Sequence, residues 1–358
     1  MRTGGKFANP LPTTCQAGGE PPIRRGPLFE AVSNRGFCYA TFTVPYMKGW
    51  VNYVLHPETE EAFMSQLRVA VVGCGGRGRG HLRVLKEFAD VDLAVVCDLV
   101  EATRDTAADE FGVVGRYANV DEMLDAESLD AVFVATPAHL NAQAALPCLE
   151  RGVSTLLEKP PGLSVAETVA LRDAAARTGA KGMVGWNRRF HPIIVKAREM
   201  VEARGPVTQL VGEFHKSITR FAESGRFPEH LMDNLFLETP IHALDIVRAI
   251  AGAEVEEMHS VVRRTISCYK DVHAALILFK NGCVAHLIAN YTTDARLERY
   301  EIHGRDISAY LEGVSDGVVF CDGQQHKLSG TGTSGTEEQN RYFLDGIKTD
   351  CPVSLPAA

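Results

Sequence analysis

A short apolar strand that ends in three spaced glycines constrains this chain more than any other feature. Residues 67–72 (LRVAVV) are apolar and largely β-branched, which is typical of a buried parallel strand. Gly73, Gly75 and Gly78 follow in G-x-G-x-x-G spacing, where a helix is expected to begin. These glycines permit a tight turn, a close approach of the backbone to a pyrophosphate, and packing of the helix on the strand. The pattern therefore predicts a phosphate-binding turn.

An acidic residue at a suitable distance strengthens this interpretation. A second strand, expected over 91–97, is followed by Asp98, about 20 residues after the last glycine. A carboxylate there meets the ribose 2′-hydroxyl of a dinucleotide and repels a 2′-phosphate, so NAD is favoured over NADP. A glycine turn that binds no nucleotide is the alternative. The residues of the turn that we predict to bind the cofactor are Gly73, Gly75, Gly76, Arg77 and Gly78.

The length and the charge of the chain limit its class. A single core seldom exceeds about 250–300 residues, so 358 residues predict two domains. The net charge of −8 disfavours a nucleic acid partner, and no apolar run is long enough to span a membrane. The nine cysteines are scattered without a C-x-x-C pair, which predicts buried thiols, no metal site and a reducing, cytoplasmic location.

Residues 1–65 differ from the rest of the chain. They are rich in Gly, Pro, Thr and Arg, and aromatic residues follow over 36–55. Arg24 and Arg25 are similar to a twin-arginine export signal, but no uninterrupted apolar stretch follows them. Met64 directly precedes the first regular strand, so an over-called gene start is one interpretation. We expect residues 1–65 to be disordered or loosely packed.

Strands and helices alternate from residue 66 onward. Capping patterns at Asn119 with Glu122 and at Ser164 with Glu167 mark two helix starts, and Gly179 marks a helix end. The alternation predicts a doubly wound parallel sheet, which we assign to residues 66–188. The helices are expected over 79–88, 101–111 and 139–151 and after Ser164, and further strands over 131–135 and 153–157.

Two loops at the carboxyl edge of this sheet carry further cofactor candidates. Thr136 and Pro137 follow one strand, and Pro137 is expected to start the next helix and to form a wall for the nicotinamide. Glu158 and Lys159 follow the neighbouring strand. Because open α/β sheets bind ligands at this edge, we predict that all four residues contact the cofactor.

The second half of the chain has a strand pattern without intervening helices. The tripeptide 280–282 (KNG) predicts a hairpin turn between two of these strands. Successive strands of this kind favour an open, mostly antiparallel sheet, so the fold class is α/β with a second α/β domain. The strands are expected over 207–218, 255–265, 274–279, 284–291, 299–303 and 318–321.

In combination, these motifs resemble the Gfo/Idh/MocA oxidoreductases. The resemblance implies a Rossmann domain followed by a substrate domain, here 189–358, and homo-oligomers joined through the open sheet. It also implies a C-terminal helix that returns to the first domain. Because the sequence ends soon after a helix expected over 337–347, we expect a truncated domain. The residues that carry the resemblance are GCGGRG at 73–78, Asp98, ATP at 135–137, EKP at 158–160, GWNRRFHP at 185–192, and His242 with Asp245.

The resemblance and the local pattern together nominate four catalytic residues. Family members use the lysine at the position of Lys159, whose pKa desolvation would lower. His242 lies in the first turn of a helix expected to begin at Thr239 and Pro240, where the helix dipole favours neutral imidazole. Asp245 shares a face with His242 and is expected to orient its ring. Glu238 stands where the family commonly has an aspartate, which alters the substrate geometry.

Alternatives remain open for several polar residues near this site. Glu213, His215 and Ser217 share one face of a strand, with Lys216 on the other. His215 and His242 are the predicted substrate contacts, although a solvated polar face is the alternative for His215. Arg188 and Arg189 either reach the cofactor or form a salt bridge between the domains.

The function that these observations favour is an NAD-dependent dehydrogenase. It would oxidise a secondary alcohol of a polyol, sugar or sugar derivative by hydride transfer to nicotinamide. The alternatives are an NAD-dependent glycosidase of the same family and a non-catalytic sensor that binds NAD and a sugar.

Overall fold

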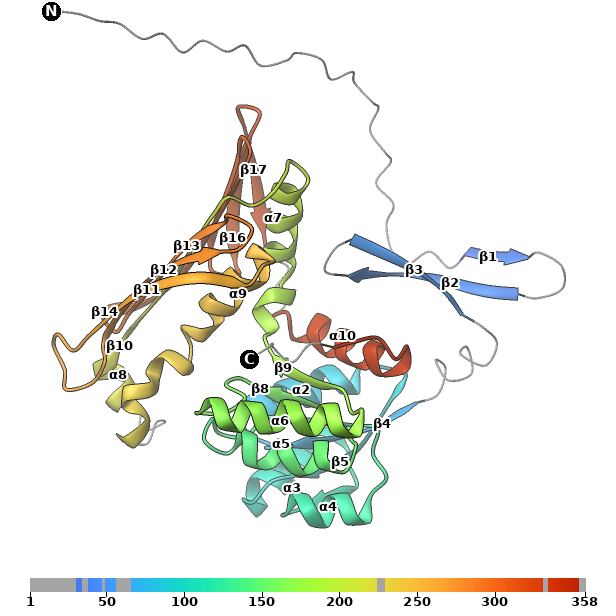
Figure 1. The fold of residues 1–358 in the computed structure, drawn as a ribbon. Coiled ribbons are helices and arrows are strands. Elements are labelled where there is room, and N and C mark those ends of the chain that lie inside the picture. The colour runs from blue at the N-terminus through green and yellow to red at the C-terminus, as the bar shows by residue number, and fades with distance from the viewer. Residues whose placement is uncertain are drawn as a thin grey trace, which may run out of the picture. The chain divides into compact units, whose positions relative to one another are not determined.

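The computed structural model describes residues 30–33, 38–46, 49–55, 66–223, 229–330 and 334–353 (Figure 1). The chain divides into two compact units, Met1–Ala62 and Phe63–Ala358. In the first unit, β1 (Glu30–Ser33), β2 (Cys38–Tyr46) and β3 (Gly49–Leu55) form an antiparallel sheet. The sequence did not predict these strands. The rest of the segment expected to be disordered, including Arg24, Arg25 and Met64, lies outside the described residues.

The first domain of the second unit is a six-stranded parallel sheet, as the alternating pattern predicted. Its strands lie in the order β6-β5-β4-β7-β8-β9, and the short strands β6 and β9 were not predicted. Both faces are buried, because Val69 and Val71 of β4 pack on one side while Ala70 and Val72 pack on the other. The strands are β4 (Leu67–Val72), β5 (Val91–Cys97), β6 (Gly115–Tyr117), β7 (Ala131–Val134), β8 (Ser154–Glu158) and β9 (Gly182–Gly185).

The helices of this domain begin close to the predicted positions. Asn119 and Ser164 cap their helices as expected, and Gly179 ends one in the left-handed conformation with φ +78°. The prediction for Pro137 as a helix start is wrong: a turn follows it, and the helix begins at Asn141. The helices are α2 (Gly76–Lys86), α3 (Glu101–Phe111), α4 (Val120–Ala126), α5 (Asn141–Glu150) and α6 (Val165–Thr178).

The second domain contains an eight-stranded sheet, in the order β11-β12-β13-β10-β14-β15-β16-β17. All neighbouring pairs are antiparallel except β10 with β13, and KNG forms the predicted hairpin. The polar strand β17 and the strand β15 were missed. The strands are β10 (Gln209–Ser217), β11 (Val255–Arg263), β12 (Val272–Phe279), β13 (Val284–Asn290), β14 (Thr292–Gly304), β15 (Ile307–Glu312), β16 (Asp316–Cys321) and β17 (Gln324–Ser329).

Helices cover one face of this sheet. Apolar residues of α7 and α9 share a buried core with Leu210 and Phe214 of β10 (Figure 1). A hypothetical Cβ at Gly212 of β10 would lie 3.3 Å from the Cβ of Ala243 on α9, so these two elements are in close contact. The helical segments are η1 (Asn187–Phe190), α7 (Pro192–Glu202), α8 (Ile218–Glu223), η2 (Glu229–Leu237) and α9 (Ile241–Ala251).

The last helix, α10 (Thr336–Lys348), returns to the Rossmann domain. Phe343 and Leu344 are fully buried in the core formed by α2, α3 and the sheet. Arg341 and Lys348 each contact Asp90 at 2.8 Å. The helix expected over 337–347 is therefore confirmed, and its apolar side chains pack on the first domain.

Candidate functional site

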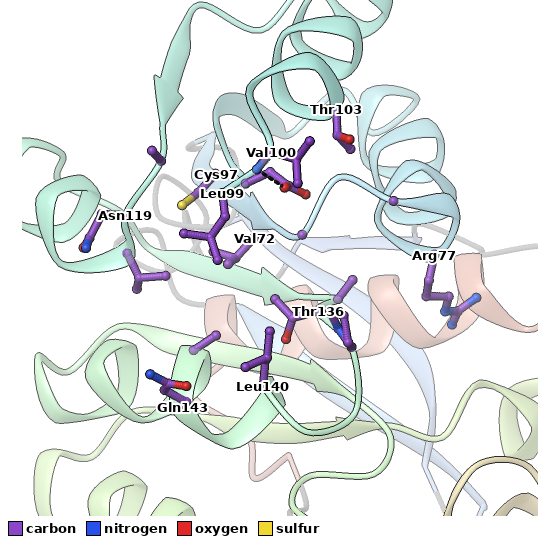
Figure 2. A pocket seen from close by; sticks show the side chains of 18 of the residues that line it. Val72, Arg77, Cys97, Leu99, Val100, Thr103, Asn119, Thr136, Leu140 and Gln143 are labelled. Atoms are coloured by element: carbon purple, nitrogen blue, oxygen red, sulfur yellow. Dashed lines mark hydrogen bonds between the residues drawn. The ribbon is translucent and has the colours of Figure 1, made fainter. Parts of the chain in front are cut away.

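A pocket of about 670 Å³ lies at the carboxyl edge of the parallel sheet. It is lined by the glycine turn, by the end of β5 with Asp98, and by the loop containing Thr136 and Pro137. Figure 2 shows Leu99 and Val100 on one side of this pocket and Leu140 on the other. This is the position at which doubly wound sheets bind ligands.

Two of the three glycines are required by the geometry of the turn. Gly73 has φ +88°, and a Cβ there would lie 2.6 Å from the carbonyl oxygen of Ala135. A Cβ at Gly78 would lie 1.8 Å from the carbonyl oxygen of Gly73. Around Gly75, by contrast, a Cβ would meet nothing within 4 Å, so the space beside the helix N-terminus is open. The turn therefore fits a pyrophosphate, and α2 has no acidic residue in its first turn to repel it.

Asp98 is held beside this turn by two backbone groups. Its Oδ2 accepts a hydrogen bond from the Cys74 N–H at 2.7 Å, and its Oδ1 accepts one from the Val100 N–H at 2.8 Å. The next two residues, Leu99 and Val100, are apolar and 78% and 58% exposed. This end of the pocket therefore offers a carboxylate and apolar surface.

Glu158 lies inside the protein instead of facing the pocket. It is 5% exposed and accepts hydrogen bonds from Arg77 Nε at 2.6 Å and from His81 Nε2 at 3.1 Å. Burial raises its pKa, but Arg77 and His81 lower it to about 2. Glu158 thus contacts Arg77, which itself lines the pocket, while a direct contact of Glu158 with the cofactor stays a prediction. Arg77 Nη1 also donates to Thr336 Oγ1 at 3.0 Å, and the buried Nη2 has no partner among the described residues.

Asn141 fixes the loop that carries Lys159, a role that sequence reasoning did not assign. This buried residue donates from Nδ2 to the carbonyl oxygens of Glu158 at 2.9 Å and Pro160 at 3.0 Å. Its Oδ1 accepts a hydrogen bond from Thr136 Oγ1 at 2.8 Å. A polar residue in the first position of α5, close after the Thr136–Pro137 loop, was the available signal.

Lys159 of the first domain contacts Glu238 of the second domain. Both residues were predicted to be catalytic. The Nζ atom of Lys159 donates a hydrogen bond to the backbone oxygen of Glu238. Burial lowers the pKa of Lys159, against the opposing effect of Glu238 and Glu158. The nearby cations Lys216 and Arg188 lower it further. Lys159 therefore exchanges its proton more readily than a solvated lysine.

His242 is buried in the second position of α9, close to Lys159. Burial, followed by the charges of Arg188 and Lys159, lowers its pKa well below 6.5, so the imidazole is neutral. The causes are burial and nearby cations rather than the helix dipole alone. Its Nδ1 atom is buried without a hydrogen-bond partner in the described parts of the chain, and the Trp186 ring lies edge-on at 6.1 Å between centroids. A neutral imidazole has one unprotonated ring nitrogen, which can accept a proton.

Asp245 and Thr239 do not make the contacts that we expected. The Asp245 carboxylate is bound by Arg189, whose Nε lies 3.0 Å from Oδ2, and it does not orient His242. Thr239 is not the helix cap, because Pro240 precedes α9 and Thr239 Oγ1 accepts a hydrogen bond from Lys216 Nζ at 2.6 Å. The three-residue spacing predicted that Asp245 shares a helical face with His242, but it did not predict that Arg189 binds the Asp245 carboxylate.

The two consecutive arginines form salt bridges, one of the two alternatives left open. Arg188 binds Glu298 of β14 through Nε and through Nη2, the latter at 2.8 Å. Arg189 binds Asp245 of α9. Both contacts join η1, at the end of the Rossmann domain, to the second domain.

His215 lies on the face of β10 opposite to the site. Strand alternation places Phe214 and Lys216 toward the helices, and Lys216 Nζ lies 3.0 Å from Glu238 Oε2. On the other face Glu213 binds Arg299 at 2.6 Å. Lys216 lies on the face opposite to His215, as predicted, and it is the residue of the two that contacts Glu238; a substrate contact of His215 stays a prediction.

Six cysteines are free thiols: Cys74, Cys97, Cys148, Cys268, Cys283 and Cys321. Burial raises the pKa of Cys74 and Cys97, beside the glycine turn, to about 12. Within the ranges that the structure describes, no three His, Cys, Asp or Glu side chains are grouped to hold a metal ion. None of the helices in these ranges has the length and apolarity needed to cross a membrane.

Two protein-family models match consecutive parts of the chain. A model described as "Oxidoreductase family, NAD-binding Rossmann fold" matches residues 67–186, and a "GFO/IDH/MocA C-terminal domain" model matches residues 194–310. Together with the fold and the glycine turn, these matches define an NAD(P)-dependent oxidoreductase. The chain belongs to the Gfo/Idh/MocA oxidoreductase family, as the sequence motifs indicated.

Curated relatives and solved structures extend over most of the chain. It is 28% identical over 282 residues to scyllo-inositol 2-dehydrogenase (NAD⁺) of Bacillus subtilis, covering 75% of this chain and 79% of the relative. It is 31% identical over 290 residues to 4-carboxy-2-hydroxymuconate-6-semialdehyde dehydrogenase of a Sphingobium species, covering 79% and 90%. The structure of UDP-N-acetylglucosamine 3-dehydrogenase from Acidithiobacillus ferrooxidans superimposes with a TM-score of 0.70 at 24% identity, covering 81% and 91%.

Proposed function

We propose that this protein is an NAD-dependent dehydrogenase that oxidises a secondary alcohol of a polyol, sugar or sugar derivative. The observation that carries the proposal is the convergence of Lys159, Glu238 and His242, whose elements come from both domains. The similarity to scyllo-inositol 2-dehydrogenase supports this substrate class. The glycosidase and sensor alternatives gain no support from these contacts.

Each of these residues has a distinct role in the proposed reaction. The glycine turn and Asp98 would hold the dinucleotide, which would supply the acceptor for the hydride of the substrate carbon. His242, neutral and with a free ring nitrogen, accepts the hydroxyl proton. The Lys159 ammonium donates a hydrogen bond to the reacting oxygen and stabilises its negative charge. Glu238 holds Lys159 through its backbone oxygen and binds a second substrate hydroxyl through its carboxylate. Asp245 acts indirectly, because it holds Arg189 and thereby η1.

The direct test follows two products at once. The protein is mixed with NAD⁺ or NADP⁺ and with polyols, aldoses, amino sugars and aryl glycosides, while reduced nicotinamide and released aglycone are measured. We expect reduced nicotinamide to accumulate with a polyol or sugar. Release of aglycone without accumulation of reduced nicotinamide would establish the glycosidase instead. Tight dinucleotide binding without turnover of any substrate would establish the sensor.

The preference for NAD depends, in our proposal, on the charge of Asp98. Asp98→Asn keeps a side-chain oxygen for the Cys74 N–H but removes the charge that would repel a 2′-phosphate. We expect the ratio of kcat/KM for NADP⁺ to that for NAD⁺ to rise at least about 10-fold. Asp92→Asn, at the opposite end of β5, is the matched control and should leave the ratio unchanged. An unchanged ratio in Asp98→Asn would show that another feature selects the cofactor.

A further inference from the structure

Four cationic side chains surround the His242 site and share only two carboxylates among the described contacts. Lys159 and Lys216 both bind Glu238, the first through its backbone oxygen and the second through Oε2 at 3.0 Å. The other two, Arg188 and Arg296, share the carboxylate of Glu298, which is 7% exposed. The neighbouring pair of Arg77 and Glu158 is already balanced. The cluster therefore carries a surplus of positive charge.

The surplus of positive charge in this cluster lies at two separate positions. Lys159, at the end nearest His242, uses its charge for the reacting oxygen in the proposed dehydrogenase. At the other end, Lys216 Nζ and Arg296 Cζ lie 6.0 and 5.3 Å from the centroid of the same Phe214 ring. Lys216 is also 4.8 Å from the Phe221 ring. Lys216 is paired with Glu238, but Arg296 shares the single carboxylate of Glu298 with Arg188, so this end keeps one positive charge without a carboxylate of its own among the described contacts.

We propose that Lys216 and Arg296 bind a carboxylate of the substrate, so that the substrate is a hydroxylated organic acid such as an aldonate or a uronate. This proposal rests on the dehydrogenase function proposed above. A carboxylate matches the surplus of one charge at this end, whereas a phosphate monoester would bring nearly two. Lys216 has one N–H left after Glu238 and Thr239, and Arg296 keeps donors beyond its bond to Glu298.

The exposed fractions of the Lys216 and Arg296 side chains are suited to binding a substrate carboxylate. Lys216 is 17% exposed and held by two partners, so it is preorganised for a ligand. Arg296 is 55% exposed and comes from β14, so it can meet a ligand that enters from solvent. Pairing a partly buried cation with a substrate carboxylate gives a charge-assisted hydrogen bond, the strongest polar contact available here.

The test compares acids with their neutral counterparts. Wild-type protein with NAD⁺ is offered gluconate and glucitol, galactonate and galactitol, glucuronate and glucose, and galacturonate and galactose, with glucose 6-phosphate as a further arm. We expect kcat/KM for the preferred acid to exceed that for its partner at least about 10-fold. Lys216→Met and Arg296→Gln should each reduce this ratio about 10-fold, chiefly through KM for the acid. Arg220→Gln, an exposed cation paired with Asp294, should keep the wild-type ratio.

The outcomes separate this inference from the proposed function. Equal or better turnover of the neutral partners, or preference for the phosphate, would overturn the carboxylate site and leave the dehydrogenase intact. If no compound is oxidised, the dehydrogenase fails, and calorimetric titration of the NAD⁺-saturated protein with the same compounds decides the inference. Binding of an acid but not of its neutral partner supports the carboxylate site. Binding of neither, or of both equally, contradicts it.

Discussion

Lys159→Met is expected to lower kcat by about 10²- to 10⁴-fold while NAD⁺ binding changes little. In the structure the Lys159 ammonium is held by the backbone oxygen of Glu238, beside the neutral imidazole of His242. Methionine keeps the length of the side chain but offers no donor to the reacting oxygen. Because burial limits the solvation of that oxygen, no water replaces the lost hydrogen bond well.

Two further variants make this experiment specific. Lys159→Arg keeps a charge but not the compact ammonium, so we expect it to recover less than a tenth of the wild-type kcat. Lys181→Met, a lysine of the same domain that pairs with Asp350, should behave like wild type. Dinucleotide affinity is measured by calorimetry on each variant. A Lys159→Met protein with more than a tenth of the wild-type kcat would remove Lys159 from the reaction.

The pH dependence of the wild-type protein gives a second readout for the same residue. Lys159 must be protonated in the proposed reaction, and burial lowers its pKa below 10.5, so the alkaline limb of the activity profile should lie below pH 10.5. His242 must be neutral, and its pKa lies well below 6.5, so the acid limb should lie below that pH. An alkaline limb that persists unchanged in Lys159→Met would belong to another group.

The parts of the structure that the sequence predicted are those determined within a few neighbouring residues. Gly73 has a φ of +88°, which glycine adopts readily, Gly78 lies against the carbonyl oxygen of Gly73, and the capping box joins Ser164 and Glu167, three residues apart. The KNG hairpin is equally local. Such features require no knowledge of the tertiary fold.

The contacts that build the site are distant in sequence, and spacing could not assign them. Arg188 and Glu298 lie 110 positions apart, and Arg77 and Glu158 lie 81 apart. Asp245 shares a helical face with His242, yet Arg189 reaches it from another element. For β10, alternation separated His215 from Lys216 but did not tell which side packs on the helices. That side is fixed by the apolar core around Phe214.

Glu158→Gln is expected to lower the free energy of unfolding by about 3 kcal/mol at pH 7, because a buried charge pair loses one partner. The glutamine side chain would leave the Arg77 guanidinium without a carboxylate partner. Because its amide is uncharged, it would also weaken the hydrogen bond from His81 Nε2. Urea unfolding measures the change, with Glu150→Gln, an exposed residue at the end of α5, as the matched control. A loss below about 1 kcal/mol would mean that solvent satisfies Arg77.

The same variant has a pH signature that a simple packing defect lacks. The pKa of Glu158 is lowered from 4.5 to about 2 in the folded protein, so its stabilising effect is complete above pH 4.5 and is lost as the pH falls toward 2. The difference in stability between wild type and Glu158→Gln should therefore be constant from pH 7 to 5 and should narrow below pH 4.5. A difference that stays constant down to pH 3.5 would assign the defect to packing. A difference that narrows below pH 4.5 would assign the defect to the lost charge of Glu158.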